Sequence, residues 1–163
     1  MDSIKAKKIA EELLEKYKIS KPIVNVFDIV KNEGIKIKFV DMVGKLENVA
    51  GFYDEESKTI FVNDDDNANK QIFTVAHELG HYALQHETDK FGVLYRMQFL
   101  DGENSDTEKE ANCFAANLLV PDRMLKEVMD KYNLNSKDGD LLASLFGVSK
   151  EMMGYRMKLL NSV

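Results

Sequence analysis

The feature that most constrains this chain is the pentapeptide His77-Glu78-Leu79-Gly80-His81. Residues four apart on an α-helix lie about 40° apart around its axis, so a helical segment projects His77 and His81 from one face. Both imidazoles can then bind one zinc ion, for which ring nitrogens are common ligands. Glu78 follows His77 directly, where its carboxylate can reach a metal-bound water without replacing it and can act as general base. The motif therefore predicts a zinc-binding helix that supports peptide hydrolysis.

The residues around this motif favour a helix over 69–86 that is enclosed on both sides. One apolar set clusters opposite the histidines and would be buried, while Phe73 and Leu84 fall near the histidine side. The opposite set is Ile72, Val75, Ala76, Leu79 and Ala83.

A three-ligand zinc site needs one more protein side chain, and the candidates are His86 and the glutamates of a helix predicted over 106–119. His86 lies five residues beyond His81, about 140° around the axis, so it is interpreted as a helix-end histidine. Glu108 shares a helical face with Asn112 and with the small Ala115, which lets two helices approach. Glu108 is therefore the preferred third ligand, and Asn112 is predicted to orient a histidine ring.

A second interpretation of the same glutamates remains open. Ser105-x-x-Glu108 and Thr107-x-x-Glu110 both match the capping-box pattern, in which the glutamate returns to the helix start. For Glu108 the ligand role is preferred over the cap. For Glu110 a cap or plain solvation is preferred over a metal-binding role.

The remaining pattern predicts an α+β fold, with a small antiparallel sheet, an active-site helix pair and a helical C-terminal region. Residues 1–135 are expected to form the metallopeptidase core, and 136–163 a helical extension packed on the same domain. Apolar residues at helical or alternating spacing set the expected elements. The further helices are 3–18, 26–30, 121–131 and two within 140–160, and the strands are 35–39, 51–53 and 59–62.

Composition excludes several other classes of function. The net charge of −6 disfavours a nucleic-acid partner, because an acidic surface repels phosphate backbones. No apolar run approaches the length of a membrane span or a secretory signal, so a cytoplasmic protein without membrane contact is expected. The single cysteine, Cys113, suits a reducing compartment and is interpreted as a small helix residue.

With these residues identified, the chain resembles the ImmA/IrrE family of zinc metallopeptidases. The matching segments are Ala76 to His81 and the pattern Glu108-x-x-Ala111-Asn112-x-Phe114-Ala115-Ala116-x-Leu118-Leu119-Val120-Pro121. Val120 replaces the commoner methionine, an apolar exchange. The resemblance implies a gluzincin-like site with zinc on His77, His81 and Glu108 and with Glu78 catalytic. It also implies a protein substrate, a helix-turn-helix transcriptional repressor that the enzyme cleaves.

Two functions other than peptide hydrolysis also fit parts of the sequence. Residues 141–160 resemble a helix-turn-helix around Gly147-Val148-Ser149, in which Lys150, Arg156 and Lys158 could contact phosphate. A metal-bound module that regulates a partner by binding, with little proteolysis, would carry the same ligands.

Two features stay open in the sequence. The segment 87–104 is long for a connection, and it suits either a lid over a cleft or irregular packing. The residue that stabilises the oxyanion is not distinguished by spacing among Tyr53, Tyr95, Arg96, Tyr155 and Arg156.

Overall fold

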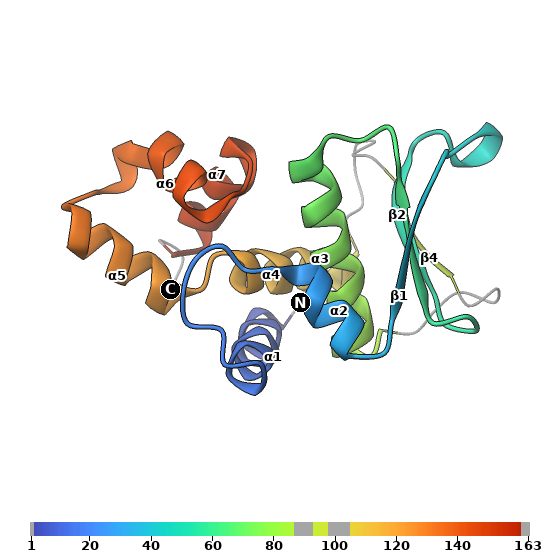
Figure 1. Cartoon of the computed structure of the whole chain (residues 1–163), viewed down its shortest axis with the longest axis horizontal. Coiled ribbons are helices and arrows are strands. Elements are labelled where there is room, and N and C mark those ends of the chain that lie inside the picture. The colour runs from blue at the N-terminus through green and yellow to red at the C-terminus, as the bar shows by residue number, and fades with distance from the viewer. Residues whose placement is uncertain (1, 87–92, 98–104, 161–163) are drawn as a thin grey trace.

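The computed structural model describes residues 2–86, 93–97 and 105–160. The sheet lies at one end of the molecule and α5 to α7 at the other, with α3 and α4 crossing between them (Figure 1). In chain order the elements are α1 (Ser3–Lys16), α2 (Val26–Asn32), β1 (Lys36–Val40), η1 (Gly44–Leu46), β2 (Val49–Asp54), β3 (Thr59–Asn63), α3 (Ala68–Leu84), β4 (Val93–Met97), α4 (Asp106–Leu119), α5 (Asp122–Tyr132), η2 (Ser136–Asp138), α6 (Gly139–Phe146) and α7 (Lys150–Leu160). The α+β class is confirmed.

The sheet is mixed, so the prediction of an antiparallel sheet was wrong. Strands β2 and β3 form an antiparallel hairpin, but β1 pairs with β3 in parallel, from Lys36 opposite Thr59 to Val40 opposite Asn63. The strand order is β1-β3-β2-β4, so the chain leaves a gap between β1 and β2 and then fills it with β3. Alternating side chains report which face of a strand is buried and carry no information on which strand lies beside it.

Strand β4 adds to the free edge of β2 in antiparallel register, within the described part of the chain. It comes from the middle of the segment 87–104, which was expected to be a lid or an irregular connection. The rest of that segment lies outside the described residues.

Helix α3 lies directly on the sheet because β2 presents a glycine to it. A Cβ added at Gly51 would come within 2.5 Å of Thr74 Cγ2 and 2.6 Å of the Phe61 carbonyl oxygen. Real Cβ atoms do not approach other atoms so closely, so only glycine permits this separation of helix and sheet. The contact determines where the His77 to His81 segment stands above the sheet.

The opposite side of α3 packs against α4 through a second glycine. A Cβ at Gly80 would lie 2.9 Å from Phe114 Cδ1 and 3.3 Å from Ala111 Cα. The close approach therefore depends on Gly80 and Ala111, and the small Ala115 on the same helix is also fully buried. It brings the first turn of α4 level with the histidines of α3.

The helix ends follow local signals in the sequence. Asn67 Oδ1 accepts a hydrogen bond from the Lys70 backbone N–H at 3.0 Å and caps α3, which ends at Gln85 in the left-handed region. Asn25 caps α2 in the same way. The predicted pair of short helices in 140–160 is confirmed as α6 and α7, separated by Gly147 at φ +65°. None of the described helices combines the length and apolar character that crossing a membrane requires.

Candidate metal centre

Three predicted ligands converge between α3 and α4. His77 Nε2 lies 3.2 Å from Glu108 Oε2, His81 Nε2 lies 3.1 Å from Glu108 Oε1, and the two Nε2 atoms are 2.9 Å apart. One donor atom from each residue lies within 4.8 Å of the other two. Two imidazole nitrogens and a carboxylate oxygen form a donor set that suits zinc and leaves a fourth position open. The residues present therefore fit a bound metal ion.

The electrostatics of the three residues favour the ligand form of the carboxylate. Burial alone would raise the pKa of Glu108, but hydrogen bonds and charge from His77 and His81 hold this pKa far below its usual range. Both histidines are buried, whereas the Glu108 side chain is 26% exposed. The site is therefore enclosed by α3 and opens to solvent on the side of Glu108.

The two interpretations of Glu108 apply to different parts of the residue. Ser105 Oγ accepts a hydrogen bond from the Glu108 backbone N–H at 3.3 Å, which caps α4. The Glu108 carboxylate faces the histidine rings. Its place in the first turn also favours a negative charge, because the N-terminal end of a helix carries partial positive charge.

Asn112 stands behind His77, as predicted. Its Oδ1 lies 2.9 Å from His77 Nδ1, so the ring nitrogen that does not face Glu108 can donate to the amide oxygen. This contact holds the proton on Nδ1 and leaves the Nε2 lone pair for a metal.

The sequence did not reveal that His86 and Glu110 act together beside His81. His86 lies just beyond the end of α3, where its Nδ1 is 2.8 Å from His81 Nδ1 and its Nε2 is 3.2 Å from Glu110 Oε2. Burial lowers the pKa of His86 more than Glu110 raises it, so the neutral ring is favoured. A separation of about 140° around the helix axis keeps His86 away from the metal-binding face of α3, but it does not prevent the His81 and His86 rings from meeting.

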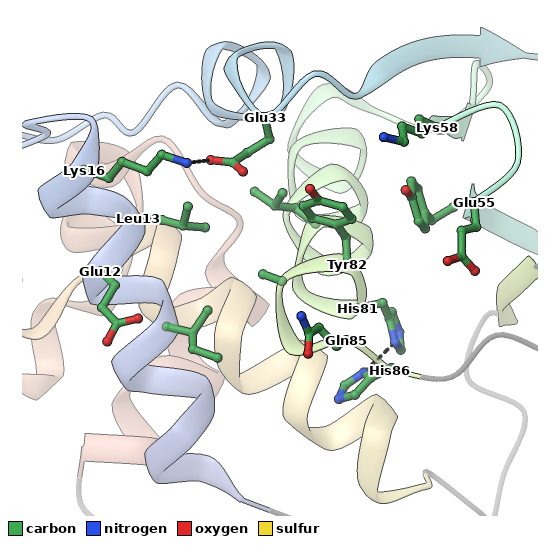
Figure 2. A pocket seen from close by; sticks show the side chains of 14 residues that line it. Glu12, Leu13, Lys16, Glu33, Glu55, Lys58, His81, Tyr82, Gln85 and His86 are labelled. Carbon is green, nitrogen blue, oxygen red and sulfur yellow. Dashed lines mark hydrogen bonds and ion pairs between the residues drawn. The ribbon is translucent and has the colours of Figure 1, made fainter.

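A cleft with a volume of about 960 Å³ opens beside this centre. Figure 2 shows it between α1 and the β2–β3 turn, with His81 and His86 near one end and the Lys16–Glu33 ion pair near the other. Tyr53 and Tyr82 line it with their rings edge to face at 5.7 Å. Burial, followed by the neighbouring Tyr82, raises the pKa of Tyr53, which keeps its hydroxyl protonated. The cleft is large enough for several residues of an extended peptide.

Glu78 is fully buried in α3, next to His77. Among the oxyanion candidates, Tyr53 lines the cleft just described. Tyr155 lines a separate cavity of about 440 Å³ that also reaches Asn112. The side chains of Tyr95 and Arg96 lie outside the described part of the structure.

Arg156 is unsuited to either role suggested for it. It is 2% exposed, its Nε donates to the Val120 carbonyl oxygen at 2.8 Å, and its guanidinium pairs with Asp122. Lys150, another proposed phosphate contact, pairs with Asp140. Because Arg156 is buried and paired, it is not accessible to DNA, and the suggestion that it binds phosphate was wrong.

Comparison with known proteins identifies the family. A family model described as the IrrE N-terminal-like domain, a peptidase family, matches residues 30–158. The chain belongs to this family.

Individual relatives of this IrrE-like domain agree with the assignment. Metallopeptidase ImmA of Bacillus subtilis (strain 168) is 28% identical over 110 residues, which are 68% of this chain and 62% of that protein. Radiation response metalloprotease IrrE of Deinococcus radiodurans is 27% identical over 61% of this chain and 29% of its own length. The matched stretch thus spans less than two thirds of either metallopeptidase. An immunity region protein of Bacillus phage phi105 is 28% identical over 90% of this chain and 85% of its own length.

The fold of this IrrE-like domain also occurs in a solved structure. A protein described as a Mycobacterium tuberculosis transcriptional regulator superposes with a TM-score of 0.64 and 17% identity, over 93% of this chain and 46% of that one. At that identity the likeness concerns the fold alone.

Proposed function

We propose that this chain is a zinc-dependent endopeptidase that cleaves a specific protein, with His77, His81 and Glu108 as metal ligands and Glu78 as general base. The observation that carries the proposal is the convergence of three donor atoms from α3 and α4 within 4.8 Å. Membership of a peptidase family and homology to two metallopeptidases support the same reaction.

The chain's own residues divide the work of hydrolysis. When bound, zinc would supply Lewis acidity, polarising the scissile carbonyl and lowering the pKa of a water ligand to about 7. The Glu78 carboxylate takes a proton from the attacking water and passes it to the amide nitrogen of the leaving peptide fragment. The cleft beside His81 holds the polypeptide, since His81, Tyr53 and Tyr82 all line it.

The substrate we propose is a helix-turn-helix transcriptional repressor, as the ImmA/IrrE resemblance implies. A phage relative named as an immunity region protein supports such a regulatory role. The acidic runs 54–56 and 64–66, together with the net charge of −6, would attract the basic DNA-binding surface of such a partner. The protein is expected to act in the cytoplasm, where repressors are found.

The test compares wild-type protein with Glu78→Gln, both loaded with zinc, on a helix-turn-helix repressor encoded by a neighbouring gene and on casein. Glutamine is similar in shape but does not take up the proton, so cleavage should fall by about 10² to 10⁴ while zinc content and fold stay unchanged. Glu15→Gln, on the exposed surface of α1, is the matched control and should cleave normally. Fragments are mapped by mass spectrometry, and one cut in the repressor with casein intact is expected.

Two outcomes would contradict the proposal. Full activity of zinc-loaded Glu78→Gln would remove this residue from the mechanism. An intact repressor with occupied zinc would favour the alternative function, a metal-bound module that regulates its partner by binding.

A further inference from the structure

The ring of metal-ligand candidate His81 is in contact with a second histidine on the side away from Glu108. His81 Nε2 faces Glu108 at 3.1 Å, and His81 Nδ1 lies 2.8 Å from His86 Nδ1. The dashed line between the two rings in Figure 2 marks this contact. His86 can stand there because α3 ends at Gln85 in the left-handed region, which turns the next residue back toward the helix.

The geometry determines the direction of both hydrogen bonds around His86. A neutral imidazole that offers its Nε2 lone pair carries its proton on Nδ1. His81 therefore donates from Nδ1 to His86 Nδ1, which must be an acceptor. The proton of His86 is then on Nε2, and this nitrogen donates to Glu110 Oε2 at 3.2 Å.

The row of contacts ends on the main chain of the N-terminal helix. Glu110 Oε1 accepts a hydrogen bond from the Asp2 backbone N–H, and Asp2 itself caps α1 through Lys5. The side chain of His86 is 6% exposed and that of Glu110 is 15% exposed. Both residues are therefore held in place by α1 and α4 and by their own burial.

We propose that His86 and Glu110 are positioning residues, which hold the His81 ring and its proton so that Nε2 is directed at the metal. A carboxylate behind an imidazole raises the basicity of a metal ligand, and here the effect passes through an intervening histidine. The Nδ1 atom of His77 has a neutral partner, the amide oxygen of Asn112. The two candidate ligands thus differ in their Nδ1 partners, an amide for His77 and a histidine paired with a carboxylate for His81.

This inference rests on the proposed metal centre but not on proteolysis, so zinc affinity is the primary measurement. A chromophoric chelator competes for zinc with wild-type protein, His86→Phe, His86→Asn and Glu110→Gln. Phenylalanine keeps a ring but accepts no hydrogen bond, and the affinity should fall by about 10- to 100-fold. Asparagine places Oδ1 where His86 has Nδ1, so it should restore most of the affinity. Glu110→Gln loses the negative charge, and its zinc affinity should lie between those of wild type and His86→Phe.

Two controls separate positioning from folding. Glu12→Gln changes a residue that lines the same cleft without touching either ring, and its zinc affinity should be unchanged. Thermal unfolding of each metal-free variant reports the stability of the fold. His86→Asn and His86→Phe should have similar melting temperatures, so that the higher zinc affinity of His86→Asn is not explained by a more stable fold.

A spectroscopic measurement tests the direction of the hydrogen bonds. In the zinc-loaded protein with ¹⁵N-labelled histidine, two-bond ¹H–¹⁵N correlations should place the proton of His86 on Nε2. A proton on Nδ1 would overturn the proposal, because such a ring cannot accept from His81.

The failure of this inference differs from the failure of the proposed function. Equal zinc affinity in wild type and His86→Phe, or an equal loss in His86→Asn and His86→Phe, would overturn the positioning role and leave the peptidase proposal standing. Tight zinc binding that depends on His86, without cleavage of any protein, would contradict the peptidase proposal alone.

Discussion

At the scale of single residues, the candidate site depends on which atom of each side chain faces the others. His77 and His81 both direct Nε2 toward Glu108, and each has a hydrogen-bond partner on Nδ1. Glu108 combines two tasks, because its backbone N–H is capped by Ser105 while its carboxylate faces the rings. Metal binding at this site therefore depends on how these side chains are oriented.

The first prediction concerns Glu108. Glu108→Gln keeps the size of the side chain but replaces the only anionic ligand of the proposed set with a neutral amide. Zinc content should therefore fall from about one per chain to near zero. Metal analysis of the purified protein measures this. The same variant should also lose the rise in melting temperature that zinc gives, since a ligand that binds only the folded state stabilises it.

The neighbouring Glu110 provides the comparison for that prediction. Glu110 does not contact the donor atoms of the centre but reaches them through His86. Glu110→Gln should therefore retain stoichiometric zinc at saturating metal. Wild-type zinc content in Glu108→Gln would show that the ligand set is wrong.

At the scale of elements, the site depends on how closely α3 can approach its neighbours. Gly51 admits α3 to the sheet, and Gly80 admits α4 to α3. Within the pentapeptide, His77, Glu78 and His81 are accounted for by their chemical roles in the proposed site. Gly80 is explained by packing, because its hydrogen atom faces Ala111 and the buried ring of Phe114.

The second prediction follows from this packing. Gly80→Ala gains about 1 kcal/mol of helix propensity but overpacks a buried contact, which costs about 1–3 kcal/mol, so a net loss is expected. Overpacking should prevail because Phe114 is fully buried and the Ala111 atoms belong to the backbone. Thermal unfolding and zinc competition measure the two consequences, lower stability and weaker binding as Glu108 moves away from the histidines.

The matched control for that substitution is Gly154→Ala in α7. Nothing lies within 4 Å of a Cβ at Gly154, so only the propensity gain remains and the melting temperature should rise. A stabilised Gly80→Ala with unchanged zinc affinity would contradict the packing argument.

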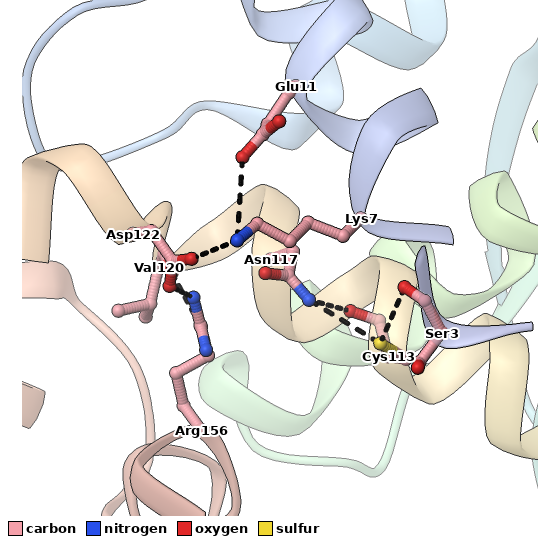
Figure 3. Close-up of polar contacts among 8 residues, drawn as sticks. All are labelled: Ser3, Lys7, Glu11, Cys113, Asn117, Val120, Asp122 and Arg156. Atoms are coloured by element: carbon pink, nitrogen blue, oxygen red, sulfur yellow. Dashed lines mark hydrogen bonds and ion pairs between the residues drawn. The ribbon is translucent and has the colours of Figure 1, made fainter. Parts of the chain in front are cut away.

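At the scale of the whole molecule, one carboxylate connects helices from both ends of the chain. Figure 3 shows Asp122 of α5 beside Lys7 of α1 and Arg156 of α7, while Arg156 also reaches the Val120 carbonyl oxygen at the end of α4. Burial alone would raise the pKa of Asp122, but the hydrogen bond from Lys7 and the charge of Arg156 lower it. This cluster joins the C-terminal helices to α1 and α4.

The third prediction is a dependence of stability on pH. Because the pKa of Asp122 is lower in the folded than in the unfolded protein, its stabilisation is present above the unfolded value of about 4 and is lost as pH falls through the folded value. Asp122→Asn should be less stable than wild type by about 1.5–3 kcal/mol near neutral pH, the range for hydrogen bonds to charged groups. The difference should shrink below pH 4, as measured by thermal unfolding from pH 3 to 7.

Asp140→Asn serves as the control, because Asp140 pairs with Lys150 where both side chains are exposed, at 74% and 68%. Exposed ion pairs contribute little, so this variant should unfold like wild type at every pH. A constant difference between Asp122→Asn and wild type across the pH range would show that the carboxylate's charge is not responsible.

Much of this protein could be predicted from local patterns in the sequence. Spacing of apolar residues and capping residues located the helices, since helix formation depends on residues three and four apart. The pentapeptide placed His77, Glu78 and His81 on one helix, and the helical face selected Glu108 and Asn112. The placements within each helix succeeded because they concern atoms within one or two turns, whereas the pairing of Glu108 with the histidines of α3 was indicated by the need for a third ligand.

Only the tertiary structure decided the features that join segments distant in the sequence. The parallel pairing of β1 with β3, the strand β4 and the burial of Arg156 depend on which elements become neighbours. His86 and Glu110 are 24 residues apart, and neither carries a pattern that reveals the other. Local periodicity determines which face of an element is buried, whereas the partner of that face is set by the packing of the whole chain.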